Sequence, residues 1–238
     1  MKEKIYAIPV NDAFSKDCEC PLCVMYKQLE DSSVEYTMGP SYMEGDIREK
    51  TDKMGFCEKH LKKIYEQDNR LGFAWVMKTH FDKIINDMEE NIKKPATAKT
   101  LFKKASVPAV SEYAKQLEAT CFICDRIKNT FERYVDTVLH LYKNDEAFKD
   151  KYKSCKGFCT SHYGILIESA YNKLSGSVLE EFVNTTNELY IENMKRVRDD
   201  VSWFINKFDH KYFNEPWKNA KDSLPRAMTK DCSIIEDD

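Results

Sequence analysis

The chain has 238 residues and a formal net charge of −3, with 42% hydrophobic and 12% aromatic residues. This hydrophobic content supports a folded core and excludes a wholly disordered chain. The nearly balanced charge provides no basic field of the kind that binds nucleic acid or an anionic membrane surface, so neither is expected as a partner. Length alone allows one large domain or two smaller ones.

The N-terminal segment lacks the apolar stretch of a secretory signal, and no later segment approaches the roughly 20 apolar residues of a membrane span. We therefore expect a cytoplasmic protein. Nine cysteines in a reducing compartment are more readily explained as metal ligands or redox groups than as structural disulfides.

Apolar residues recur at intervals of three and four along most of the chain, which indicates amphipathic helices. Long helices are predicted at 22–34, 57–67, 71–93, 122–142, 159–174 and 178–208, and a short one at 111–118. In 71–93 the apolar stripe includes Leu71, Trp75, Phe81 and Ile85. No segment alternates with a period of two for long, and glycines are few. The predicted fold class is all-α, with long helices packing into a bundle.

One pattern occurs twice. Cys20-Pro-Leu-Cys23 is followed by Gly55-Phe-Cys57-Glu-Lys-His60, and Cys121-Phe-Ile-Cys124 is followed by Gly157-Phe-Cys159-Thr-Ser-His162. Corresponding positions lie 101 or 102 residues apart, which indicates an internal duplication. The predicted domains are a first repeat at 1–94, a linker at 95–107, a second repeat at 108–210 and a C-terminal tail at 211–238.

Each repeat supplies three cysteines and one histidine at matched positions, the ligand set that Zn²⁺ takes in closed tetrahedral sites. We expect one Cys3His site in each half and two zinc ions per chain. The predicted ligands are Cys20, Cys23, Cys57 and His60 in the first half and Cys121, Cys124, Cys159 and His162 in the second.

The local spacing supports this assignment. Ligands three residues apart lie on one face of a helical turn. Pro21 suits the first position of a helix, which makes Cys20 a cap residue. Gly55 and Gly157 would allow a sharp turn before the second pair of ligands. Cysteines in the first turn of a helix lie in the positive field of the helix dipole, which favours the thiolate.

Two other interpretations remain open. The Cys-x-x-Cys pairs are also compatible with buried core cysteines or a redox couple beside incidental histidines. An iron–sulfur cluster with one histidine ligand is the main alternative to zinc. Three further cysteines, Cys18, Cys155 and Cys232, have no counterpart in the other repeat.

Other polar residues carry weaker signals. His80 is interpreted as a helix-surface histidine or a hydrogen-bonded core histidine rather than a ligand. The lysine-rich stretch at 93–104, which contains Phe102, is interpreted as a solvated linker. Standard catalytic motifs are absent, and four protein ligands leave no open position on a metal, so an enzyme with a catalytic metal is the least favoured of the functional alternatives.

Several segments resemble an uncharacterised bacterial family, a domain of unknown function. The resemblance rests on IPVNDAF, CPLC, YTMGPSYMEGDIREKTDKMGFCEKH, NRLGFAWVMKTH and the closing WFINKFDHKYFNEPW. Members of that family are sometimes labelled ABC-transporter substrate-binding proteins. Such proteins are normally exported and α/β, so this chain argues against the label. The resemblance implies a bacterial origin and adds no activity.

The leading functional hypothesis is a non-enzymatic, zinc-stabilised helical protein that presents a surface or groove to a protein partner or small ligand. The alternative is a redox or metal sensor in which the Cys-x-x-Cys thiols release metal and oxidise. The additional thiols Cys18 and Cys155, each close in sequence to a site, favour that alternative.

Overall fold

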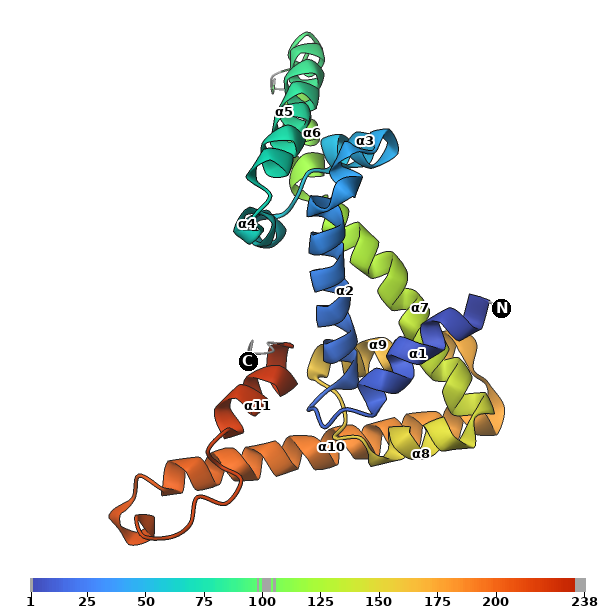
Figure 1. Ribbon diagram of the computed structural model, residues 1–238, viewed down its shortest axis with the longest axis vertical. Coiled ribbons are helices and arrows are strands. Elements are labelled where there is room, and N and C mark those ends of the chain that lie inside the picture. The colour runs from blue at the N-terminus through green and yellow to red at the C-terminus, as the bar shows by residue number, and fades with distance from the viewer. Residues whose placement is uncertain (1, 98, 100–103, 105, 234–238) are drawn as a thin grey trace. The chain divides into compact units, whose positions relative to one another are not determined.

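The computed structural model describes residues 2–97, 99, 104 and 106–233 (Figure 1). The described chain is all-helical and contains no β-strand, as predicted. The α-helices are α1 Lys2–Phe14, α2 Pro21–Met38, α3 Gly45–Met54, α4 Glu58–Glu66, α5 Arg70–Ile92, α6 Ala109–Glu118, α7 Phe122–Asn144, α8 Glu146–Ser154, α9 Thr160–Lys173, α10 Gly176–Asn206 and α11 Ser223–Cys232. Two short 3-10 helices, η1 Pro40–Met43 and η2 His210–Tyr212, complete the described structure.

The helices follow the sequence duplication. Helices α1 to α5 of the first repeat recur in the same order as α6 to α10 of the second. The long helices predicted from apolar spacing are observed as α2, α4, α5, α7, α9 and α10, and their ends lie within a few residues of the predicted ones. Four further helices, α1, α3, α8 and α11, were not among the predicted elements.

The chain divides into two compact units that do not follow the two repeats. Unit 1 comprises Met1–Gln28 and Thr130–Asp238, and unit 2 comprises Leu29–Asn129. The division falls inside α2 and inside α7, so each of these helices contributes to both units. This differs from the predicted domains, since residues 95–107 lie within unit 2 and not between two units. Positions 98, 100–103 and 105 of the predicted linker, including Phe102, lie outside the described residues.

The core of unit 1 is aromatic. Phe14, from α1, packs against Phe148 and Tyr152 of α8, with ring centroids 5.0 and 5.6 Å apart. Tyr152 in turn contacts Phe182 of α10 at 5.3 Å. These rings are almost fully buried. Their packing holds α1, α8 and α10 together beside the segment that leads to Cys159.

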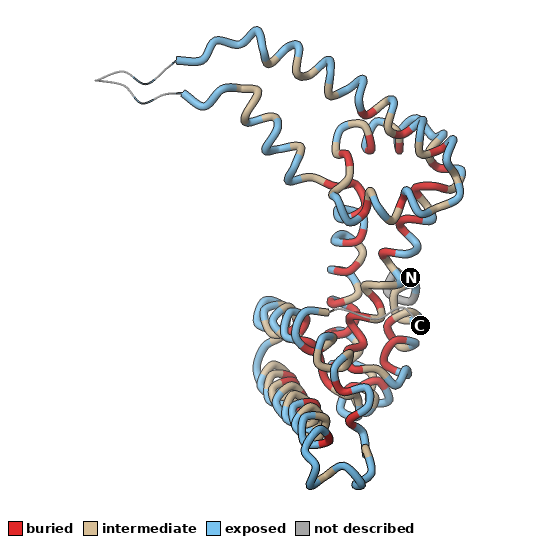
Figure 2. The backbone as a smooth tube through the Cα atoms, turned by 90° about the vertical axis from the view of Figure 1, so that its left-hand side faces the viewer, coloured by how far each residue is buried: buried red, intermediate tan, exposed pale blue. Residues whose placement is uncertain are grey.

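Unit 2 has a smaller core, in which α3 packs against α5. Here α5 buries Gly72, Val76 and His80, while Leu71, Trp75, Phe81 and Ile85 of the predicted apolar stripe are exposed. Figure 2 shows mostly exposed residues along α5 and α6, the two helices that flank the grey segment. Periodicity therefore identified the helix but not the face that it buries.

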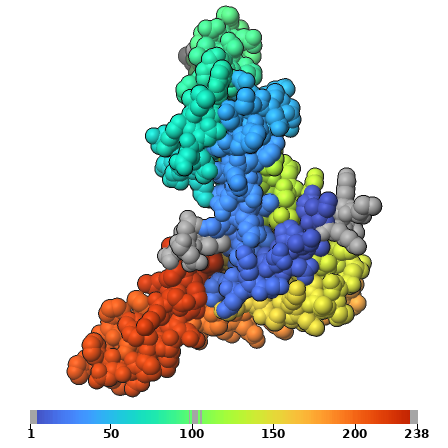
Figure 3. Space-filling model, viewed as in Figure 1, coloured from blue at the N-terminus to red at the C-terminus, as the bar shows by residue number. Residues whose placement is uncertain are grey.

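The C-terminal tail is not free. Helix α11 packs against α9 and α10 of unit 1, and Figure 3 shows it in red beside the orange α10. Within the tail, the ring of Trp217 contacts Phe204 with a centroid distance of 5.8 Å. No described helix is both long and apolar enough to cross a membrane.

Candidate metal centres

The eight predicted ligands gather into two clusters, each with three cysteines and one histidine. Site A consists of Cys20, Cys23, Cys159 and His162, and site B consists of Cys57, His60, Cys121 and Cys124. Within each site the ligand atoms all lie within 4.8 Å of one another, so both can hold a metal ion. Site A lies entirely in unit 1 and site B entirely in unit 2.

The grouping of the ligands corrects the sequence prediction of one site per half. Site A joins the Cys-x-x-Cys of the first repeat to the Cys-x-x-His of the second, and site B joins the remaining two pairs. The reason lies in α2, which begins at Pro21 beside site A and has 18 residues. A helix of that length spans about 27 Å. The helix leaves unit 1 after Gln28, and the chain that follows it carries Cys57 in unit 2.

The distances suit a single tetrahedral ion. Typical zinc bond lengths to sulfur and nitrogen require about 3.8 Å between two sulfurs and about 3.5 Å between sulfur and nitrogen. In site A, Cys23 and Cys159 Sγ are 3.6 Å apart, and His162 Nδ1 lies 3.2–3.5 Å from the three sulfurs. In site B, Cys57 and Cys124 Sγ are 3.9 Å apart, and His60 Nδ1 lies 3.3 Å from each sulfur.

Helix starts position most of these ligands. Cys20 and Cys121 directly precede α2 and α7, and Cys57 and Cys159 are the N-cap residues of α4 and α9. The Cys159 sulfur accepts a hydrogen bond from the backbone N–H of His162 at 3.5 Å, as an N-cap side chain does. Each site therefore lies at the N-terminal ends of two helices, where the helix dipoles favour thiolates. Cys20 directly precedes Pro21, the first residue of α2, which agrees with its predicted cap position.

Two glycines make the turns before α4 and α9. Gly55 has a φ of +59° and Gly157 a φ of +77°, in the left-handed region that other residues rarely adopt. A Cβ atom at Gly157 would lie 2.7 Å from the backbone oxygen of Leu189 in α10. The predicted turns are confirmed, and at Gly157 close packing requires glycine as well.

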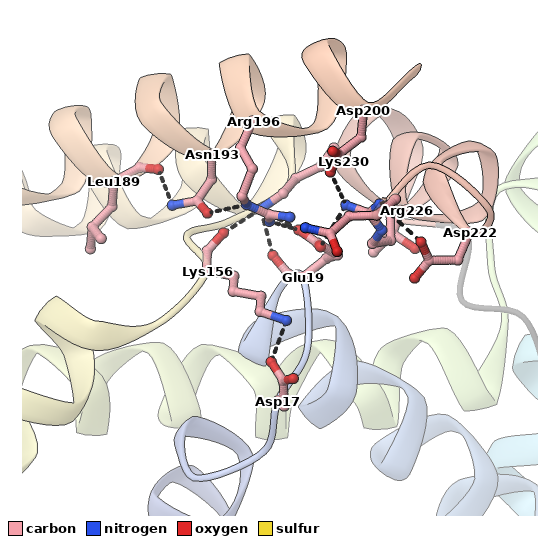
Figure 4. A network of polar contacts seen from close by, with 12 residues as sticks. Asp17, Glu19, Lys156, Leu189, Asn193, Arg196, Asp200, Asp222, Arg226 and Lys230 are labelled. Atoms are coloured by element: carbon pink, nitrogen blue, oxygen red, sulfur yellow. Dashed lines mark hydrogen bonds and ion pairs between the residues drawn. The ribbon is translucent and has the colours of Figure 1, made fainter. Parts of the chain in front are cut away.

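Site A is enclosed by polar contacts that α11 makes. Lys230, which is 2% exposed, donates to the backbone oxygen of Glu19 at 2.7 Å and to the backbone oxygen of Lys156. Glu19, next to Cys20, also pairs with Arg196 of α10 (Figure 4). The Oγ of Ser233 lies 3.0 Å from Cys159 Sγ. The C-terminal helix thus joins the two loops that carry the ligands of site A.

Site B has a carboxylate beside its histidine. Glu30 Oε1 lies 3.0 Å from His60 Nε2, so the ring directs Nδ1 toward the sulfurs and Nε2 toward Glu30. Lys59 and Lys63 each pair with Glu30 at 2.7 Å. A carboxylate behind a ligating histidine fixes the ring and raises its basicity. Glu30 was not among the predicted site residues. The duplication could have identified it, because Glu30 aligns with Phe131. A charged residue therefore stands in the first repeat where the equivalent helix of the second has a residue of its apolar face.

The closely spaced ionisable groups of site B have shifted pKa values. Burial raises the pKa of Cys121, but hydrogen bonds from His60 and the backbone of Cys124 outweigh it and lower that pKa to about 6. Burial lowers the pKa of His60, whereas its contacts with Cys121 and Glu30 raise it to about 9. Burial and the neighbouring Cys121 charge raise the pKa of Cys124 to about 12. Since metal binding must displace these protons, affinity should fall as pH decreases.

The remaining candidates fall outside both sites. Cys18, Cys155 and Cys232 belong to neither cluster, and all nine cysteines are free of disulfides. His80 is buried, and its Nδ1 lies 2.7 Å from the backbone oxygen of Asp52, which confirms a hydrogen-bonded core histidine. Its ring packs directly against Gly55, where an added Cβ would lie 2.7 Å from Nε2.

Comparison with known proteins agrees with the resemblance noted in the sequence. The sequence profile described as a family of unknown function, DUF6062, matches residues 1–238. The chain belongs to DUF6062. No curated protein and no solved structure gives a significant match to this DUF6062 chain. Its function is therefore inferred from the two clusters.

Proposed function

We propose that this DUF6062 protein binds two zinc ions, which stabilise its fold by joining helix starts that are far apart in the sequence. The observation that carries the proposal is the pair of Cys3His clusters with near-tetrahedral spacing. Cys20 and Cys159 of site A are separated by more than half of the chain. A metal ion that bridges such segments stabilises only the folded state.

The ligand chemistry favours zinc over an iron–sulfur cluster. Three thiolates and one imidazole form a common structural zinc set, whereas iron–sulfur clusters are typically held by four cysteines or by two histidines and two cysteines. A cluster contains several irons and inorganic sulfides between its ligands. The ligand atoms here lie within 4.8 Å of one another, which suits one ion.

A structural and interaction role is the best-supported function. Four protein ligands complete a tetrahedral shell and leave no position for a substrate, which argues against a catalytic metal. The thiolates require a reducing compartment, consistent with a bacterial cytoplasm. With a net charge of −3, a protein partner or small ligand is favoured over nucleic acid or a membrane surface.

Elemental analysis tests the proposal directly. Protein purified without added metal is expected to be colourless and to contain two zinc ions per chain, because both clusters have a full ligand set. Chelation under denaturing conditions followed by refolding without metal should give a less helical chain by circular dichroism. The control is Cys232→Ser, which replaces an exposed cysteine outside both sites and should retain both ions. Iron with visible absorption, or protein without metal, would contradict the proposal.

A further inference from the structure

The two sites differ in their exposure to solvent, although their ligand sets are identical. All four ligands of site A are buried. In site B, His60 and Cys121 are buried, Cys57 is half-buried and Cys124 is exposed. Solvent and dissolved donors can therefore reach a ligand of site B, while the protein encloses those of site A.

Site A also has a cover, which α11 forms. Helix α11 holds the loops before Cys20 and Cys159 through the buried Lys230, and Ser233 contacts the Cys159 sulfur. This helix has no counterpart among the ten helices of the two repeats. Reaching the metal position of site A from this side would require α11 to detach and the buried Lys230–Glu19 pair to separate.

The surroundings of the histidines differ as well. At the position ten residues after the first cysteine of each Cys-x-x-Cys pair, α2 carries Glu30 and α7 carries Phe131. Glu30 contacts His60 of site B, whereas the Phe131 ring lies 5.2 Å from that of His162 in site A. Tyr26 is the next ring beside His162, at 6.4 Å. One histidine is held by a charged network and the other by aromatic packing.

We propose that site B exchanges its metal with the surroundings while site A retains its ion, so that the protein takes up and releases one thiophilic divalent cation per chain. This inference depends on the proposed function, since it assumes that both sites bind zinc. Exchange would require a dissolved donor to take the place of one thiolate in the ligand set. Cys124, at the exposed side of site B, is the thiolate that can leave.

Glu30 keeps the rest of site B assembled during exchange. By fixing His60, it holds Nδ1 toward the metal position when Cys124 departs, and the salt bridges to Lys59 and Lys63 hold Glu30 itself. Glu30 is a positioning residue here, because it acts through His60 and does not belong to the ligand cluster. The combination of a held histidine and an accessible thiolate suits reversible exchange better than permanent retention.

The test follows zinc release from the full-length, zinc-loaded protein into an excess of a chromogenic pyridylazo chelator. Wild-type protein should release one zinc per chain rapidly and the second slowly. Two single-ion variants assign the phases: Cys159→Ser, which disables site A, should keep the rapid phase, and Cys121→Ser, which disables site B, should keep the slow one. Native mass spectrometry should show that each variant is folded and carries one zinc ion.

Glu30→Gln provides a test that leaves every ligand in place. It should weaken zinc binding at site B by about 10- to 100-fold, as loss of a carboxylate behind a ligating histidine typically does, and leave the slow phase unchanged. Glu35→Gln, at an exposed position of the same helix, is the matched control and should behave as wild type.

The outcomes separate this inference from the proposed function. Two zinc ions released at one common rate would overturn the exchange proposal and leave the structural role of zinc intact. A rapid phase that persists in Cys121→Ser would overturn the assignment to site B. Protein without bound zinc would contradict the proposed function itself.

Discussion

A chain with Cys159→Ser is expected to contain one zinc ion in place of two and to unfold far more readily than the wild type. Cys159 is fully buried, supplies a sulfur to site A and caps α9, so serine removes a ligand and weakens a helix start. Loss of a structural zinc ion lowers the free energy of unfolding by on the order of 5 kcal/mol or more. Chemical denaturation followed by circular dichroism measures this change.

The neighbouring cysteine supplies the control for this experiment. Cys155 is half-buried, lies four residues before Cys159 and belongs to neither site. Cys155→Ser should therefore keep two zinc ions and unfold close to the wild-type midpoint. If Cys159→Ser retained two ions and wild-type stability, site A would be wrongly assigned.

The second large effect is expected for Gly157→Ala. This glycine has a φ of +77°, and an alanine Cβ would lie 2.7 Å from the Leu189 backbone oxygen. A left-handed conformation costs a non-glycine residue about 1–2 kcal/mol, and overpacking adds about 1–3 kcal/mol. Because the contact is with the backbone of α10, a side-chain movement cannot relieve it. We expect a destabilisation of about 2–5 kcal/mol together with weaker zinc binding at site A.

Gly164→Ala is the matched control for that substitution. Gly164 lies within α9, and an added Cβ would meet no atom within 4 Å. Alanine in a helix interior is more favourable than glycine by about 0.5–1 kcal/mol, so this variant should be slightly more stable than wild type. Equal stabilities for Gly157→Ala and wild type, measured by urea denaturation, would show that the turn before Cys159 tolerates a side chain.

The sequence was sufficient to predict which residues form the two clusters, because their spacing is a local property. Short spacings indicate helix starts wherever those helices lie in the fold. Cys20 stands directly before Pro21, and Cys159 stands three residues before His162. The pairing of the ligands is not local. Two similar Cys-x-x-Cys pairs and two similar Cys-x-x-His pairs can combine in two ways, and only the paths of α2 and α7 through both units select one.

The surroundings of the sites were harder to predict for a different reason. Helix α11 buries Lys230 and Ser223 in place of a periodic apolar stripe, so hydrophobic spacing gave no indication that it packs against the core. On α5 the apolar residues Trp75 and Phe81 are exposed while His80 is buried, the reverse of what polarity suggests. Lys230 in α11 and His80 in α5 are buried and hydrogen-bonded to backbone oxygens, and such partners become visible only in three dimensions.

The zinc content of two double variants tests the crossed pairing of the ligands most directly. Cys23→Ser with Cys159→Ser removes two ligands of site A, so this chain should retain one zinc ion. Cys23→Ser with Cys57→Ser removes one ligand from each site, so it should lose both high-affinity ions. The opposite result, with one ion retained by the second variant and none by the first, would show that each repeat builds its own site.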